Sequence, residues 1–233
     1  MNGNPISLSP RFERRFYATM SGLALCVVLV GFARTYYLKE FFGEPSLPML
    51  LHLHGAIMTG WFALYVVQAA LIRAGRVDLH RVLGVAGAAL AFVLVPVAIA
   101  TARHFVVRML DDAELLPLAA AIAGFDLVVV AVFAFLVGAA ICWRRRTDIH
   151  KRLMTLAAFS LLGPPLARVV GDEYAVLASN LLVLVPIVID TLWNRRLHPA
   201  FGWGGALVVL SSRAAVTLVT QPAWTGFAVH LLR

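Results

Sequence analysis

Four histidines occupy positions where their imidazole rings could bind a cofactor. His52 and His54 come early in a long apolar stretch, and His80 and His150 each come at the start of another one. Neutral imidazole is the commonest metal ligand in proteins and an axial ligand of haem iron. We therefore expect haem b or a transition metal, copper or iron, as the bound group. Such a group could carry electrons or be delivered to a respiratory enzyme.

The first two histidines cannot bind the same group. A helix turns by about 100° per residue, so His52 and His54 point about 200° apart. Met58 follows His54 by one turn on the same helix face. A histidine and a methionine at that spacing suit copper or a haem iron. The competing interpretation is a histidine at the membrane interface above a methionine that only packs.

The other two histidines lie in a repeated motif. Residues 78–83 (DLHRVL) match residues 148–153 (DIHKRL). The aspartate of each copy is suited to the N-cap of a helix, where it accepts hydrogen bonds from free backbone amides. His80 and His150 then lie in the first turns of two helices, at the same depth, and could be paired ligands. The competing interpretation is two histidines beside lipid phosphates that bind no cofactor.

The elements that must position these residues are membrane-spanning helices. The chain is 61% hydrophobic and 14% charged, whereas soluble domains are about 45–50% apolar and about 25% charged. A bilayer core of about 30 Å requires about 20 apolar residues in a helix. Runs of that length cover residues 16–34, 48–72, 80–103, 115–143, 151–170, 174–193 and 202–221.

These runs predict an all-α protein, a polytopic membrane bundle of about seven transmembrane helices. We expect residues 1–15 to form a cytoplasmic tail and residues 16–233 to form a single domain. Within it, residues 48–103 and 115–170 form a helical hairpin that is used twice. An alternative is that the first run is a cleaved signal peptide, which would leave one span fewer.

Basic residues mark one side of this bundle. They gather in the tail and at alternate junctions: Arg11, Arg14, Arg15, Arg73, Arg76, Arg81, Arg144, Arg145, Arg146, Lys151, Arg152, Arg195 and Arg196. Basic residues flank the cytoplasmic ends of membrane helices, which predicts a cytoplasmic N-terminus and an external C-terminus. The net charge of +8 then reflects topology and membrane lipids, and it gives no reason to expect nucleic-acid binding.

Several polar side chains fall inside the apolar runs, where such groups are costly and mark functional sites. Four of them lie in the outer half and are expected to line one outward-facing cavity: Asp126, Arg168, Asn180 and Arg213. Asp126 is expected to neutralise one of the two arginines. Gln68 and Asp190 are expected near the inner boundary, with the histidines of the repeated motif. Asp190 is either a proton-relay group or an ion-pair partner of Arg152 or Arg195.

This polar set supports hypotheses other than redox chemistry. The main rival is a transporter or small-molecule-binding protein, because repeats and helix-breaking prolines such as Pro164-Pro165 are common around transport sites. Another is a membrane-embedded enzyme that acts on a lipid-like substrate, with a histidine as base or metal ligand. A last one is a structural subunit of a larger complex. The sequence alone does not decide whether the chain is an enzyme.

The motifs also carry a resemblance. The segments His52-Leu-His54-Gly55, Leu79-His80-Arg81-x-Leu83-Gly84 and His150-Lys-Arg-Leu-Met154, together with Gln68, resemble a family of uncharacterised bacterial multi-pass membrane proteins. The likeness covers most of residues 48–170 and implies the bacterial inner membrane, but it names no reaction. Shorter pieces resemble small membrane proteins linked to cytochrome oxidase maturation, which implies a respiratory-chain partner.

Two histidine sites on opposite sides of the membrane would resemble the layout of dihaem b-type cytochromes. This sequence departs from that layout in its second hairpin. At the repeat spacing, the counterparts of His52 and His54 are Ile122 and Gly124, neither of which can ligate a metal.

Overall fold

The computed structural model describes residues 10–232. The chain is 83% helix, and no strand occurs in the range described, so the all-α expectation is confirmed. The helices are α1 (Pro10–Gly31), the π-helical η1 (Ala33–Tyr37), α2 (Met49–Arg73), α3 (Val77–Val107), α4 (Leu116–Cys142), α5 (Thr147–Ser160), α6 (Gly163–Val170), α7 (Asp172–Asn194), α8 (Pro199–Val219) and α9 (Trp224–Leu232). Residues 1–9 of the expected tail lie outside the described residues, and residues 10–15 belong to α1.

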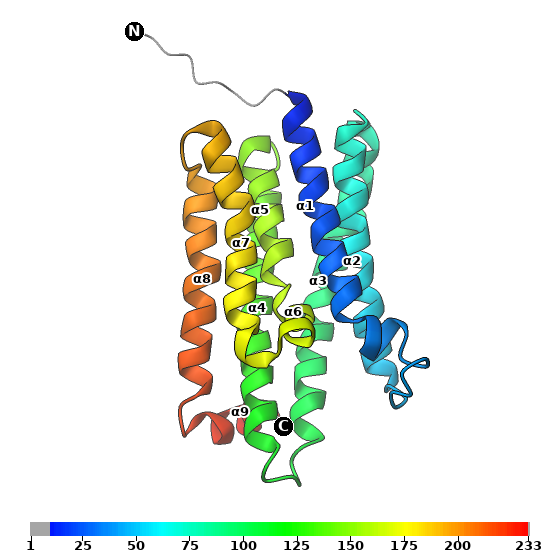
Figure 1. The fold of residues 1–233 in the computed structure, drawn as a ribbon, viewed down its shortest axis with the longest axis vertical. Coiled ribbons are helices and arrows are strands. Elements are labelled where there is room, and N and C mark those ends of the chain that lie inside the picture. Colours follow the sequence, from blue (N-terminus) through cyan, green and yellow to red (C-terminus); the bar gives the residue numbers. More distant parts are fainter. Residues whose placement is uncertain (1–9, 233) are drawn as a thin grey trace.

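The long helices run side by side along the longest axis of the molecule (Figure 1). Six of them are long and apolar enough to cross a membrane, and the bent pair α5 and α6 brings the number of spans to seven if it counts as one. The polytopic helical bundle is therefore confirmed. We call the end with the α2–α3, α4–α5 and α7–α8 junctions the basic end, at the top of Figure 1. Its junction arginines are Arg73, Arg76, Arg144, Arg145, Arg146, Arg195 and Arg196.

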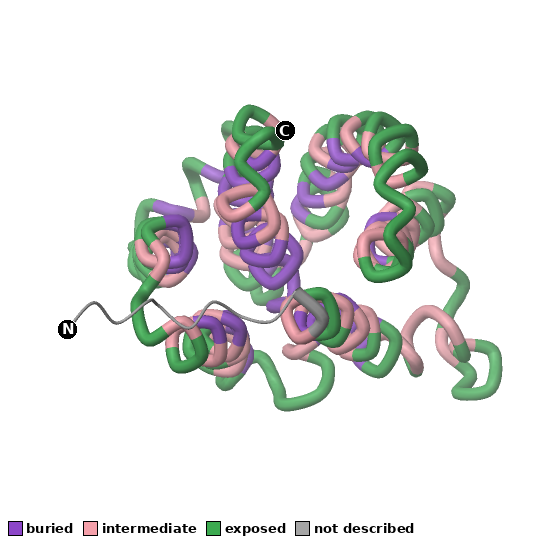
Figure 2. The backbone as a smooth tube through the Cα atoms, turned by 90° about the horizontal axis from the view of Figure 1, so that it is seen from above, coloured by how far each residue is buried: buried purple, intermediate pink, exposed green. Residues whose placement is uncertain are grey.

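The core lies around α4 and α5. Helix α4 packs against α3, α5, α8 and α9, and α5 also contacts α1, α7 and α8. Buried residues occupy the inward faces, whereas exposed ones cover the outside (Figure 2). The outside carries large apolar side chains such as Phe92, 82% exposed, and Leu192, 73% exposed. Such a surface suits contact with lipid chains rather than water.

The expected span 151–170 is broken into two helices. Helices α5 and α6 are bent by 44° relative to each other, and Pro164 and Pro165 occupy the start of α6. Proline has no backbone N–H and cannot donate to the carbonyl four residues earlier. The carbonyls of Ser160 and Leu161 therefore lose their usual helical donors, and the helix ends there.

The aspartates of the repeated motif do not cap their helices, and that expectation was wrong. The N-cap residues of α3 and α5 are Arg76 and Arg146, and neither helix has a side-chain cap hydrogen bond. Asp78 and Asp148 lie instead in the first turns, 3.3 Å and 3.9 Å from those same arginines. A carboxylate in the first turn still interacts favourably with the positive end of the helix dipole.

The chain does not end at the last expected span. After Pro222 it forms the short helix α9, at the end of the bundle opposite the basic end (Figure 1). The indole nitrogen of Trp224 donates a hydrogen bond of 2.9 Å to the carbonyl of Ala120 on α4. Gly124, one turn further along α4, leaves room for the Trp224 ring.

Candidate cofactor site and neighbouring polar clusters

The structure brings His80 and His150 together near the basic end. They lie in the first turns of α3 and α5, and their ring centroids are 6.4 Å apart with the ring planes at 83°. Both side chains are half-buried. The repeated motif therefore places two imidazoles against each other from two different hairpins.

The ring of His150 is held by a backbone carbonyl. Its Nδ1 lies 2.8 Å from the carbonyl oxygen of Ala140 in the last part of α4. Because a carbonyl only accepts, Nδ1 carries the hydrogen and the neutral ring keeps its lone pair on Nε2. This Nε2 has no hydrogen-bond partner among the described residues. Metal-ligating histidines usually donate their other ring N–H to a carbonyl or carboxylate in this way.

Two buried polar atoms of this site also lack partners in the described part of the chain, one on Gln68 and one on His80 itself. The side-chain nitrogen of Gln68 donates to the backbone carbonyl of His80 at 3.2 Å. Within residues 10–232, the Oε1 atom of Gln68 and the Nδ1 atom of His80 are buried without a hydrogen bond. A buried polar atom without a partner costs about 1–3 kcal/mol, so such atoms usually have a role. Gln68 thus belongs with the histidine pair, as the sequence suggested.

The histidine pair has no third His, Cys, Asp or Glu beside it among the described residues. No group of three or more His, Cys, Asp or Glu residues that could hold a metal ion occurs in the part of the chain that the structure describes. Structural zinc sites use four protein ligands and catalytic zinc sites use three. Two histidines alone therefore suit a cofactor that brings its own ligands.

His52, His54 and Met58 lie in different surroundings. His52 is exposed, and its ring centroid lies 5.9 Å from that of Tyr36. Met58 packs against the hydrophobic core. No group of three or more His, Cys, Asp or Glu residues includes His54 among the described residues, and the site at His54 and Met58 stays a prediction.

His54 instead joins a cluster with Asp126 and Arg168. The guanidinium of Arg168 interacts electrostatically with both. It also lies over the Phe32 ring at 4.4 Å from the centroid and donates to the carbonyl of Pro164 at 2.9 Å. Asp126 has neither an ion pair within 4.0 Å nor a hydrogen bond in the described part of the chain. The expected pairing of Asp126 with Arg168 is thus a longer-range interaction.

The sequence predicted that four polar residues line one outward-facing cavity. That prediction was wrong for Asn180 and Arg213. Asn180 contacts Ser212 on α8, at 3.1 Å between the amide oxygen and the hydroxyl. Arg213 is exposed and forms no ion pair among residues 10–232. Each residue turns a helix by about 100°, so Arg213 points away from the interior that Ser212 faces. Depth along a helix could be estimated from the sequence, but rotation could not.

Asp190 does not belong to the histidine cluster either. Its carboxylate is buried and receives two hydrogen bonds from Arg152, at 3.1 Å from Nε and 2.7 Å from Nη2. The remaining Arg152 nitrogen donates to the backbone carbonyl of Asp148 at 2.8 Å. This bidentate pair ties α5 to α7. Ion pairing with Arg152 was one of the two expectations for Asp190, and it is the one that the structure shows.

The polar network around this pair was not expected from the sequence. Lys151 forms an ion pair with Glu13 of α1. His198 accepts a hydrogen bond at Nδ1 from the amide of Ala200, at 3.2 Å, and so caps α8. Its Nε2 lies 3.3 Å from the carboxylate of Asp148. Burial and the charge of Arg152 lower the pKa of His198, and Asp148 offsets part of that effect.

Comparisons with protein-family models, with curated proteins and with solved structures gave no match for this chain. Its function is therefore inferred from the geometry of its own residues.

Proposed function

We propose that this chain is a redox membrane protein that binds one haem b through His80 and His150. The observation that carries this proposal is the 6.4 Å separation of their ring centroids. Two imidazoles on one metal, with metal–nitrogen bonds of about 2.0–2.1 Å, have ring centres roughly 6 Å apart. The angle of 83° between the ring planes is compatible with this arrangement, since each ring can rotate about its own metal–nitrogen bond.

The donor set favours haem over a bare metal ion. A haem iron takes four nitrogens from its porphyrin and needs only axial ligands from the protein. Two histidines without a third ligand match that need. A copper or iron ion bound by the same two residues would keep most of its coordination sphere open to water. When bound, the haem would supply one-electron chemistry, and the chain would supply the ligands and their orientation.

The protein groups around the pair have separate tasks in this proposal. Ala140 holds the His150 ring by accepting its Nδ1 hydrogen, which fixes the ring and leaves Nε2 for the iron. Gln68 anchors the backbone at His80 through its amide nitrogen. Its unpartnered Oε1 is the atom best placed to accept a hydrogen bond from the bound cofactor or from water.

A single haem also fits the lack of an outer counterpart. His54 lies with Asp126 and Arg168, and no second histidine accompanies it in the cluster described above. The Trp224 ring occupies the space beside Gly124, the repeat counterpart of His54. One haem cannot pass electrons across the whole bilayer. We therefore infer electron exchange with a partner at one face, such as a respiratory complex, or a role in the maturation of one.

The basic end faces the cytoplasm in this proposal. Arginines gather at its three junctions, and positive residues flank the cytoplasmic ends of membrane helices. The haem then lies near the cytoplasmic face of a bacterial inner membrane, with the N-terminus inside and the C-terminus outside. A reporter fused to the C-terminus tests this orientation, because a cytoplasmic signal from it contradicts the assignment.

The test of the haem proposal is an optical spectrum of the purified protein before and after dithionite, with metals measured on the same sample. We expect a reduced b-type band, lost in His80→Ala and in His150→Ala. His230→Ala is the matched control, because His230 is an exposed histidine on α9. A folded, colourless and metal-free wild-type protein, purified from cells supplied with haem precursor, would refute the proposal.

A second candidate, binding or transport of a small molecule, is supported by Trp61. The indole Nε1 of Trp61 is buried without a partner among the described residues, and its ring packs on Phe133 at 5.0 Å. His54 and Asp126 each precede one of these rings by two turns, on helices that run in the same direction. His54 and Asp126 therefore lie at one depth, about 10 Å along their helices from the Trp61 and Phe133 rings. This candidate predicts that Asp126→Asn weakens ligand-induced thermal stabilisation, and a broad metabolite panel without any stabilising compound counts against it.

A further inference from the structure

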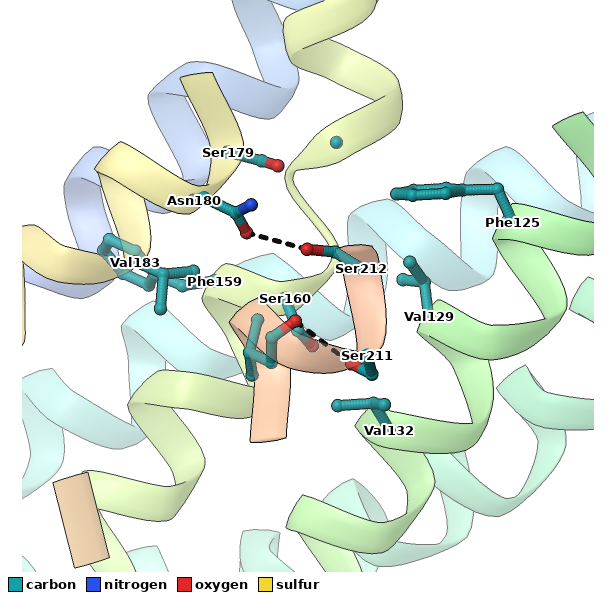
Figure 3. Close-up of a pocket in the computed structure, with 12 residues that line it drawn as sticks. Phe125, Val129, Val132, Phe159, Ser160, Ser179, Asn180, Val183, Ser211 and Ser212 are labelled. Atoms are coloured by element: carbon teal, nitrogen blue, oxygen red, sulfur yellow. Dashed lines mark hydrogen bonds between the residues drawn. The ribbon is translucent and has the colours of Figure 1, made fainter. Parts of the chain in front are cut away.

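A small cavity lies between α4, the α5–α6 break, α7 and α8, away from the histidine pair. Its free volume is about 20 Å³, room for about one water molecule. One side is apolar and includes Phe125 and Val129 (Figure 3). The other side carries the oxygen atoms of five side chains: Ser160, Ser179, Asn180, Ser211 and Ser212.

The hydroxyl hydrogens of the four serines are already used. Each serine donates to the backbone carbonyl three residues earlier in its own helix. The donor–acceptor distances are 2.9 Å for Ser160, 3.1 Å for Ser179, 3.0 Å for Ser211 and 2.9 Å for Ser212. A hydroxyl has one hydrogen to donate and two lone pairs that accept. The serine oxygens can therefore offer only lone pairs to whatever occupies the cavity.

The amide of Asn180 adds to this acceptor surface. Its oxygen points toward Ser212, and the two oxygens are 3.1 Å apart (Figure 3). The hydroxyl of Ser212 has two possible acceptors, this amide oxygen and the carbonyl of Val209. An oxygen atom of Asn180 is thus directed into the group of serine oxygens. The same amide also carries an NH2 group, which can only donate.

The helix break leaves two carbonyls without their helical donors, and one of them belongs to Ser160, which lines the cavity. Pro164 and Pro165 have no N–H to donate to the carbonyls of Ser160 and Leu161, which precede them by four residues. These carbonyls also lie at the C-terminal end of α5, where the helix dipole is negative. Unwound carbonyls and half-helix C-termini at mid-membrane are the groups that coordinate sodium ions in many membrane proteins.

We propose that this cavity is a binding site for a monovalent cation, Na⁺. The polar groups that line it are neutral, namely four serine hydroxyls and the Asn180 amide, and the lining residues include no carboxylate, so it lacks the charge that a calcium site requires. Its volume suits one small ion. A water molecule is the other occupant of that size, but the four serines already donate their hydrogens to backbone carbonyls, whereas a cation needs only the lone pairs that their oxygens keep.

The site lies near the middle of the bundle. Ser160 is the last residue of α5 and Ser212 lies far along α8, so both are roughly 20 Å from the basic end at about 1.5 Å per residue. An ion there would join α5, α7 and α8 through their own oxygens. Bound Na⁺ would therefore hold the broken helix against its neighbours, and this role does not depend on whether haem is bound.

The primary experiment measures binding of ²²Na⁺ to the purified wild-type protein by scintillation proximity. A parallel experiment measures the unfolding temperature in NaCl, KCl and choline chloride at equal ionic strength. We expect saturable binding of one ion per chain, displaced by unlabelled Na⁺ and not by K⁺, and a higher unfolding temperature in NaCl. The absence of ²²Na⁺ binding, with equal unfolding temperatures in the three salts, would mean that the cavity holds only water and would overturn the proposal.

Variants locate the ion. Ser212→Ala and Ser179→Ala each remove one oxygen and should weaken Na⁺ binding at least tenfold. Ser21→Ala is the matched control, because Ser21 is also buried and donates to the carbonyl three residues earlier, at 2.8 Å, but lies on α1 away from the cavity. Wild-type affinity in both cavity variants would show that the ion binds elsewhere. If a cavity variant fails to fold, the wild-type ²²Na⁺ measurement still decides between an ion and water.

Discussion

The Nδ1 atom of His150 donates a hydrogen bond of 2.8 Å to the carbonyl of Ala140 across the α4–α5 junction. The bond fixes both the tautomer and the direction of the ring, because the carbonyl can only accept. His80 has no equivalent anchor for its ring, and its Nδ1 is buried without a partner among residues 10–232. The two ligands of the proposed haem are therefore unequal, with His150 held rigidly and His80 held through its backbone.

This inequality makes His80 the better position for changing the ligand. Methionine at one axial position raises the reduction potential of a haem relative to two histidines. We expect His80→Met to retain haem, to change its reduced spectrum and to raise the potential by on the order of 0.1 V. A redox titration monitored by absorbance measures this, with His230→Met as the control. An unchanged spectrum and potential in His80→Met would exclude His80 as a ligand.

The buried pair of Arg152 and Asp190 should dominate the stability of the basic end. Removal of one member leaves the other charge buried alone, which costs about 3–5 kcal/mol. We expect Asp190→Asn or Arg152→Met to lower the unfolding temperature strongly in detergent. The double variant Arg152→Met with Asp190→Leu should recover much of that loss, because apolar residues of similar volume replace a buried pair well.

An exposed pair provides the comparison for this prediction. Arg146 lies 3.9 Å from the carboxylate of Asp148, and its side chain is 67% exposed. Exposed ion pairs contribute about 0–1 kcal/mol, so Arg146→Gln should change the unfolding temperature little. Equal losses in Arg146→Gln and Arg152→Met would show that Arg152 acts through general charge rather than through its pair with Asp190.

Stability should depend on pH through His198. The folded protein lowers the pKa of this histidine, whereas an unfolded histidine has a pKa of about 6.5. The unfolded chain therefore binds more protons below that value, and stability falls as the pH falls. The stabilisation is complete above pH about 6.5 and is lost as the pH falls through the folded pKa. Protonation of Nδ1 also removes the cap on the Ala200 amide, worth about 1 kcal/mol.

The change His198→Asn separates these effects. Asparagine is a good N-cap residue and does not titrate, so it should preserve stability near neutral pH and remove this part of the pH dependence. The measurement is the unfolding temperature of both proteins from about pH 5 to about pH 8, the range in which histidine titrates. Parallel curves for wild type and His198→Asn would assign the pH dependence to other groups.

The sequence predicted depth well and rotation poorly. A bilayer requires about 20 apolar residues per span, and that requirement locates the helices and puts His80 and His150 at one level. Which way a side chain points depends on the packing of neighbouring helices. For that reason Arg213 was expected inside and lies outside, and Asn180 was grouped with Asp126 although it faces Ser212 instead.

Other features of the site had only a partial signal in the sequence. The Pro164-Pro165 pair indicated a broken helix, but the cavity beside it depends on serines from three helices that no local pattern connects. The partner of Asp190 was narrowed to two arginines, and the choice of Arg152 required the position of α7 against α5. Helix α9 could not be predicted from hydrophobic length, because it is too short to span a membrane.

Helix α9 should depend on the absence of a side chain at position 124. A Cβ atom added to Gly124 would lie 2.1 Å from the Trp224 ring, which real structures do not allow. We expect Gly124→Ala to push Trp224 away from α4, to break its hydrogen bond to Ala120 and to cost about 1–3 kcal/mol through overpacking.

Gly138→Ala is the matched control on the same helix, because a Cβ there meets nothing within 4 Å. It should be neutral or stabilise α4 by up to about 1 kcal/mol. Unfolding temperature and proteolysis within α9 measure both changes, and a Gly124→Ala protein as stable and as protease-resistant as Gly138→Ala would contradict the packing of α9 on α4.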